Sequence, residues 1–146
     1  MNIFEKIILR SIDADRFAEI TNLPKIFLNE SISTYIPSLK MSNEGPVLTS
    51  IFLITENYLC EVAIPNSGAE IFDAVDLRKV QHIKVESEEV TVDLESGKVL
   101  SYRKIKFEIR HFKNLLSVVE YSGGEAEEWF KEVMKFLPVS ILLGRD

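Results

Sequence analysis

The segment from Ser122 to Leu137, SGGEAEEWFKEVMKFL, restricts most strongly how this chain can fold. Its apolar residues recur at alternating intervals of three and one, and a period of 3.6 residues per turn places them on one stripe of a helix. We predict an amphipathic helix that begins with a capping box of Ser122 and Glu125 and ends at Pro138. The stripe consists of Ala126, Trp129, Phe130, Val133, Met134 and Leu137.

This stripe needs a large apolar surface to cover it. A buried Val, Leu, Phe or Met side chain contributes ~1.5–3 kcal/mol relative to an exposed one. The residues upstream supply segments with the character of strands, so the helix should lie against a β-sheet. We expect Trp129 to be buried between the helix and that sheet.

Segments rich in β-branched and aromatic residues follow one another from Val47 to Tyr121, with turn residues between them. We predict about seven antiparallel strands, closed by the C-terminal helix, in a barrel or in strongly curved sheets. The first two strands should form a hairpin around Glu56 and Asn57, and a polar corner is expected at Ser87 and Glu88. The expected strands are 47–55, 58–64, 71–75, 80–86, 89–94, 101–112 and 115–121.

The first 46 residues have a different pattern. One or two short helices are expected before residue 21, with Asn2 and Asp13 as caps, and Pro24, Pro37 and Pro46 then interrupt the periodicity. Residues 21–46 are too apolar for a free linker and are expected to form a packed connector, with either a helical turn or a short strand compatible with the pattern. We predict one α+β, mainly β domain over residues 1–146. It should comprise a helical or irregular segment (1–46) packed on the barrel, a core (47–137) and a tail (138–146).

The charge balance is acidic, with 17 basic and 23 acidic residues and a net charge of −6. Such a chain is repelled by phosphate backbones and anionic lipids, so we expect neither nucleic acid nor stable membrane association. A single cysteine cannot form an internal disulfide, and charges interrupt the short apolar run near the N-terminus. The cytoplasm is the expected compartment.

Three stretches together resemble the pleckstrin-homology-like barrel, in particular its bacterial and GRAM-type relatives. They are LTSIFLITENYLCEVAI, VDLRKVQHIKV and EAEEWFKEVMKFL, and the resemblance covers roughly residues 47–137. It implies a seven-stranded barrel with a capping helix. Lipid-binding members of the family carry basic residues beside the first hairpin loop. The matching loop here, 55–57, has no Lys or Arg, so the resemblance does not extend to phosphoinositide binding.

No residue pattern in the chain predicts catalysis or a metal site. His82 and His111 stand alone, and there is no HxH, HExxH or CxxC spacing. Cys60 has no neighbouring base in the sequence, so a structural role is favoured over a nucleophilic one. We therefore expect a protein that is not an enzyme and that has no catalytic residues, no metal and no cofactor.

One basic concentration offers candidate binding residues. Arg103, Lys104, Lys106 and Arg110 lie on the longest expected strand, where they could bind an acidic peptide or a headgroup. Alternating charge is also typical of the water-exposed face of an antiparallel strand, and Glu108 interrupts the row. A solvated face is the favoured interpretation.

Three functions are compatible with these patterns. The first is a non-enzymatic interaction module that binds a protein, peptide or small ligand through a barrel end, a sheet edge or the N-terminal segment. The second is a small enzyme or ligand carrier with a pocket between a curved sheet and a helix, which needs a polar group such as His82, His111 or Tyr102 to point inward. The third is an acidic inhibitor or immunity-type protein that meets a basic partner.

Overall fold

The computed structural model describes residues 2–64 and 71–143. Within these ranges the strands form two antiparallel sheets, one of four strands in the order β1-β2-β3-β4 and one of three in the order β5-β6-β7. The mainly β fold with helices before and after the strands is confirmed. The helices are α1 (Ile3–Leu9), α2 (Ala14–Thr21), α3 (Leu23–Leu28) and α4 (Ala126–Leu143), with a 3-10 turn η1 (Leu77–Lys79). The strands are β1 (Thr34–Ser42), β2 (Gly45–Ile54), β3 (Tyr58–Ala63), β4 (Ile71–Asp76), β5 (His82–Asp93), β6 (Val99–His111) and β7 (Asn114–Gly123).

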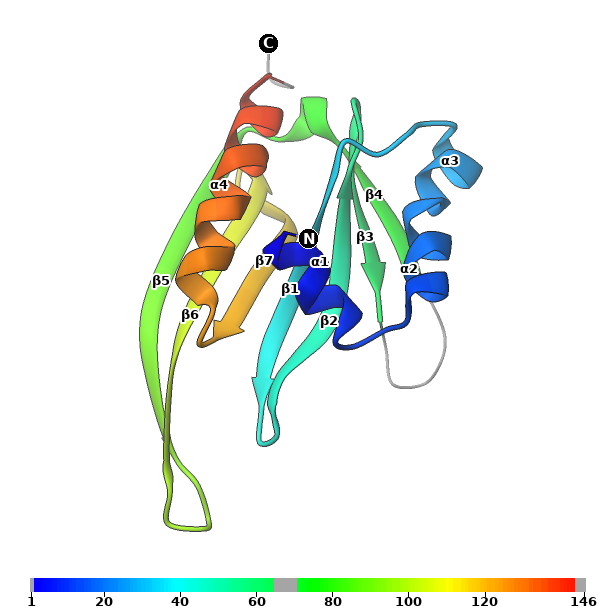
Figure 1. Cartoon of the computed structure of the whole chain (residues 1–146). Helices are drawn as coiled ribbons and strands as arrows, with labels where there is room; N and C mark the ends of the chain where they lie inside the picture. Colours follow the sequence, from blue (N-terminus) through cyan, green and yellow to red (C-terminus); the bar gives the residue numbers. More distant parts are fainter. Residues whose placement is uncertain (1, 65–70, 144–146) are drawn as a thin grey trace.

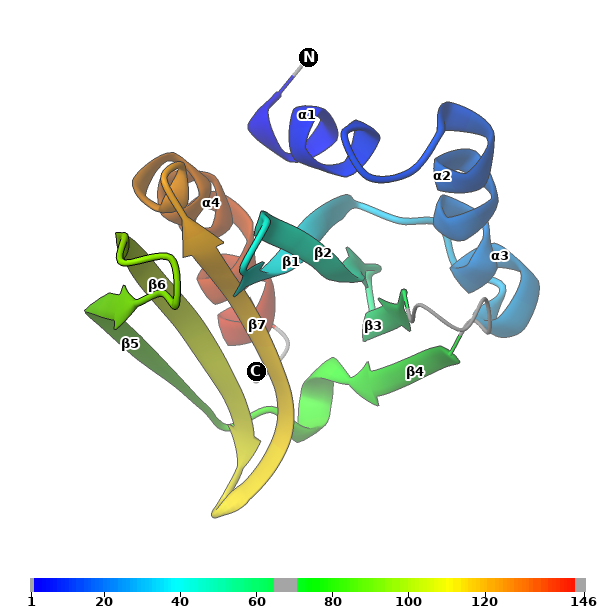
Figure 2. The ribbon, with the colours of Figure 1, turned by 90° about the horizontal axis from the view of Figure 1, so that it is seen from below.

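The two sheets stand side by side, with β7 next to β1 (Figure 1). From below they are seen to meet at an angle, and α1, α2 and α3 follow one side of the four-stranded sheet (Figure 2). Helix α4 lies in front of the three-stranded sheet, on the same side of the molecule as α1 (Figure 1). The described strands of the two sheets share no main-chain ladder, so the wall of strands is curved but not closed.

A serine side chain connects the sheets where β1 and β7 meet. The Ser38 hydroxyl accepts a hydrogen bond from the main-chain N–H of Glu120 (2.9 Å) and donates one to the carbonyl of the same residue (3.0 Å). The register of β1 against β2 shifts between Ser38 and Leu39. This β-bulge redirects the strand locally beside β7.

The N-terminal helices pack on the strands as predicted. The side chains of Asn2 and Asp13 accept hydrogen bonds from the main-chain N–H groups of Glu5 and Arg16, so both expected caps are confirmed. In α1, Phe4, Ile7 and Ile8 are buried. Ring contacts Phe17–Tyr35 and Phe27–Phe72, with centroids 4.9 and 5.2 Å apart, join α2 and α3 to the four-stranded sheet.

One part of the N-terminal segment is not irregular. Residues 34–42 form β1, which pairs along its length with β2, so the expected boundary at residue 46 is wrong. Pro37 hid this strand in the sequence, because proline cannot donate to a ladder. Proline is tolerated at an edge strand, and β1 is the outer strand of its own sheet.

The predicted corner at Ser87 and Glu88 is also wrong. These residues lie within β5, and their register opposite Ile105 and Lys104 is unbroken. What changes is the face that carries the apolar residues. Val85 is opposite Phe107, on the side of α4, whereas Val90 is five positions further on and therefore points to the other face. Within one continuous strand, the apolar side chains thus move from one face of the sheet to the other.

The C-terminal helix has boundaries different from those expected. Ser122 and Gly123 belong to β7, and the carbonyl of Glu125 accepts the first helical hydrogen bond, from Trp129, so there is no capping box. The helix continues past Pro138 to Leu143, and residues 144–146 of the expected tail lie outside the described residues. A proline removes one main-chain bond and bends a helix, but it does not always end it. Met134, expected on the buried stripe, is 42% exposed.

Candidate functional site

Trp129 fixes the position of α4. Its side chain is fully buried, as predicted, and its ring lies 5.7 Å from Tyr121 and 6.0 Å from Phe107, measured between centroids. The indole Nε1 donates a hydrogen bond to the carbonyl of Pro37 (2.8 Å). The ring of Phe130 stacks on the ring of Phe107, with the centroids 5.8 Å apart. These contacts hold α4 over β6, β7 and β1.

The first turn of α4 is held by a second anchor. The Arg10 guanidinium, just after α1, donates two hydrogen bonds to the Glu125 carboxylate at 2.6 and 3.2 Å. The hydrogen bond from Arg10 lowers the pKa of Glu125, against the opposing effect of partial burial. Helix α4 is thus tied to α1, and its main strand contacts are with β6 and β7.

Because α4 covers β6 and β7, the inner face of β5 remains open. A cleft of about 390 Å³ lies between α4 and the strands β5 and β6. Its apolar lining is formed by Val85, Ile105 and Phe130. Val85 is 45% exposed, whereas Ile105 beside it is buried. These three side chains form an apolar pocket that could accept one apolar side chain of a ligand.

Polar residues complete the lining of this cleft. Ser87 and Arg103 come from the strands, and Glu127 and Lys131 come from the first turns of α4. Within residues 2–64 and 71–143, none of the three charged side chains has a hydrogen-bond or ion-pair partner. Their groups are available to a ligand in the cleft.

Strand β5 is the outer strand of its sheet. Among the described strands it pairs only with β6, so the N–H and C=O groups of its outer edge have no strand partner. Exposed edges of this kind are templates for an additional strand. An open edge and an apolar cleft therefore lie side by side on β5.

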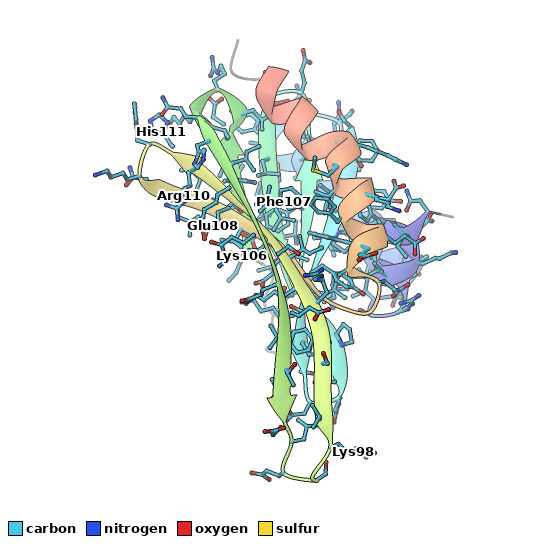
Figure 3. All side chains as sticks on the ribbon, turned by 90° about the vertical axis from the view of Figure 1, so that its left-hand side faces the viewer. Lys98, Lys106, Phe107, Glu108, Arg110 and His111 are labelled. Carbon is cyan, nitrogen blue, oxygen red and sulfur yellow. The ribbon has the colours of Figure 1, made fainter. Side chains whose placement is uncertain are left out.

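The four basic residues singled out in the sequence are not brought together. Lys106 and Arg110 point away from α4, whereas Phe107 between them points toward it (Figure 3). Arg103 is four positions from Phe107, so it points to the same face of the sheet and lines the cleft. The other three basic residues, Lys104, Lys106 and Arg110, thus share the face that strand alternation predicts, whereas Arg103 lies on the opposite face.

Acidic neighbours neutralise the remaining three. Glu108, which is buried, accepts hydrogen bonds from Arg110, and these lower the pKa of its carboxyl. Lys106 lies 3.2 Å from Glu86 and 3.6 Å from Glu108, and Lys104 lies 3.9 Å from Glu120. An internal network of charges on the sheet explains this row without a ligand.

The histidines do not line the cleft beside α4. His111 Nδ1 contacts the carbonyl of Lys79, and His82 lines a second, polar cavity of about 450 Å³ next to Arg78. No group of three His, Cys, Asp or Glu residues in the described part of the chain could hold a metal ion. Burial raises the pKa of the Cys60 thiol to about 12, so its reactive thiolate is scarce at neutral pH.

Sequence reasoning missed the cleft and one partly exposed polar contact. The Glu30 carboxylate accepts hydrogen bonds from the Thr55 hydroxyl (3.0 Å) and from the main-chain and side-chain nitrogens of Asn57 (both 3.1 Å). The turn between β2 and β3, taken as the first hairpin in the sequence, is the second, and the donors of Thr55 and Asn57 are already bonded. In the sequence, the signal for the cleft was an apolar residue, Val85, directly before the acidic stretch 86–89.

Comparison with protein-family models, curated proteins and solved structures gave no significant match for this chain. None of the helices in residues 2–64 and 71–143 has the length and apolar character needed to cross a membrane.

Proposed function

We propose that this protein is a non-enzymatic interaction module that binds an extended segment of a partner protein along the outer edge of β5. The observation that supports this function is the position of the apolar cleft directly beside an edge that no described strand pairs with. In strand addition, main-chain hydrogen bonds provide affinity and pockets for alternate side chains provide specificity. Val85, Ile105 and Phe130 form the pocket for one apolar side chain of the segment.

The arrangement of elements supports a place near the pleckstrin-homology-like barrels. Four antiparallel strands, then three, then one helix follow in the order that the resemblance implies. We propose a divergent domain of this kind, open between its sheets. A cytoplasmic location belongs to the same proposal, because the single cysteine is a buried free thiol.

The cleft also favours a second candidate, a carrier of a small ligand. Its volume of about 390 Å³ lies within the range of about 300–1,000 Å³ that is usual for ligand pockets. Arg103 and Lys131 at its rim would suit an apolar molecule with an anionic group. Such a ligand would bind without contacts along the edge of β5, which separates it from a peptide.

Substitution in the cleft tests the proposed function. Peptides of about twelve residues selected from a random library on the intact protein should shift the amide resonances of β5 and α4. Val85→Asp should weaken their binding at least tenfold, because it places a carboxylate among apolar groups. Ile71→Asp, at a 59% exposed position on the edge strand β4, is the matched control and should leave binding unchanged. Peptides that shift only resonances elsewhere, or equal losses in both variants, would refute the site.

Binding to phosphoinositides is not expected. The Thr55–Asn57 turn has no Lys or Arg, its Thr55 hydroxyl and Asn57 nitrogens are bonded to Glu30, and the chain carries a net charge of −6. Co-sedimentation with vesicles that contain a phosphoinositide should not exceed that with vesicles of phosphatidylcholine alone, measured at physiological salt. Retention on phosphoinositide vesicles that is lost on substitution of residues 55–57 would contradict this expectation.

A further inference from the structure

The outer half of the β5–β6 hairpin carries a second apolar surface. This part of the hairpin projects beyond the rest of the molecule (Figures 1 and 3). Val90 is opposite Tyr102, and Val92 is opposite Leu100, on the face turned away from the cleft. We name these four residues the arm face. Isolated two-stranded ribbons are marginally stable in water, so an apolar face here gains from a partner.

The arm face and the cleft lie on opposite sides of the same strand. Val85 lines the cleft, and the change of face described above puts Val90 and Val92 on the other side. Any strand that pairs with β5 alternates its own side chains in the same way. To contact both surfaces, it must therefore carry apolar residues at an odd spacing, five positions apart, instead of the even spacing of an ordinary amphipathic strand.

The charge of β5 identifies the kind of partner. Residues 86–95, ESEEVTVDLE, contain five acids and no base. Glu86 is paired with Lys84 and Lys106, whereas Glu88 and Glu89 are exposed and have no ion pair within the described ranges. Opposite charges at facing positions of neighbouring strands contribute about 0.2–1 kcal/mol, and like charges repel. A second copy of β5 would bring acids against acids, so the edge favours a basic segment over self-pairing.

We infer that the segment bound by β5 has a basic centre between two apolar anchors on opposite faces. This rests on the proposed function and specifies its partner. The residue in the cleft, opposite Val85, is counted as position zero. The segment then has Lys or Arg at the third and fourth positions, opposite Glu88 and Glu89. Apolar residues follow at the fifth and seventh positions, opposite Val90 and Val92. The pattern holds for either direction of the bound strand.

Three synthetic peptides of equal length test the pattern on the intact protein, with fluorescence anisotropy as the readout. The first has Leu in the cleft position, Lys at the third and fourth positions and Val at the fifth and seventh. The second has the same composition, with the two Val moved to the fourth and sixth positions and one Lys moved to the fifth, which restores even spacing. The third has Glu in place of both Lys. We expect the second and third to bind at least tenfold more weakly than the first.

A charge exchange in the protein provides the reciprocal test. Glu88 and Glu89 are exposed, but the double variant Glu88→Lys/Glu89→Lys places each new Lys opposite a base of β6, Lys104 or Arg103, so circular dichroism must first show that it retains the fold. It should reverse the preference, so that the Glu peptide binds more tightly than the Lys peptide. Higher salt should weaken the matched pairs.

The outcomes separate this inference from the function on which it rests. Equal affinity of the three peptides, or an unchanged preference in the double variant, overturns the inferred pattern. The same holds if none of the three binds while library-selected peptides still shift the resonances of β5. If no peptide of any sequence contacts β5, the proposed function fails as well.

Discussion

Trp129→Ala should lower the free energy of unfolding by about 3–5 kcal/mol, the cost of removing a large aromatic side chain from a packed core. Trp129 is fully buried against Phe107 and Tyr121, and its removal leaves the carbonyl of Pro37 without its indole donor. Urea denaturation followed by circular dichroism measures the change. The midpoint should shift strongly, because the substitution affects the contact of α4 with both sheets.

Met134→Ala is the matched control on the same helix. Met134 is 42% exposed, so its truncation should change the free energy of unfolding by less than about 1 kcal/mol. Equal stability of Trp129→Ala and the unaltered protein would show that α4 does not depend on this anchor. Equal losses in the two variants would show that the helix, instead of the indole contact, determines stability.

Removal of α1 should prevent stable folding. A chain that begins at Asp13 lacks Phe4, Ile7 and Ile8, each exposed by 1% or less. At ~1.5–3 kcal/mol for each side chain, the loss is about 5–9 kcal/mol, comparable with the total stability of many domains, about 5–15 kcal/mol. The shortened chain should aggregate or lack a cooperative thermal transition, as measured by size-exclusion chromatography and circular dichroism.

Ile26→Ser is the control for this truncation, because Ile26 lies on α3 and is 64% exposed. It should leave solubility and the thermal midpoint close to those of the unaltered protein. Limited proteolysis provides an independent check. Rapid trimming to a soluble and equally stable fragment that begins near Thr34 or Val47 would contradict a structural role for the N-terminal helices.

A strand could be predicted from the sequence where the same residue pattern continued along its whole length. The hairpin of β2 and β3 follows from two runs of β-branched and aromatic residues around a short turn, and it is confirmed. In β5 the rule of alternation changes phase between Val85 and Val90, and a local pattern cannot distinguish this change from a corner. Only pairing with β6, which makes the same change, keeps the strand continuous.

The predicted start of helix α4 was wrong for a different reason. Ser122 and Glu125 have the spacing of a capping box, but Ser122 is paired with Lys104 across the sheet, and Glu125 contacts Arg10. These partners are 18 and 115 positions away in the chain, so local spacing could not reveal them. Tertiary contacts routinely outweigh local propensity in this way.

The candidate site was less predictable than the fold. Of the four basic residues proposed from the sequence, only Arg103 lines the cleft. The sequence places all four on one strand, and alternation gives the side of the sheet that each occupies. The acids beside them on β5 and β7 depend on strand pairing. Phe130 was expected only as part of a buried stripe, and its partial exposure in the cleft arises because α4 packs mainly on β6 and β7.

The bond between Ser38 and Glu120 has a consequence for motion. Because one hydroxyl replaces a main-chain ladder where β1 meets β7, rotation about a single side-chain torsion is enough to release the N–H of Glu120. Hydrogen exchange with deuterated solvent should therefore be faster at this amide than at amides of β6, which are bonded to strands on both sides. The two sheets would then separate first along this line, while each keeps its own ladder intact.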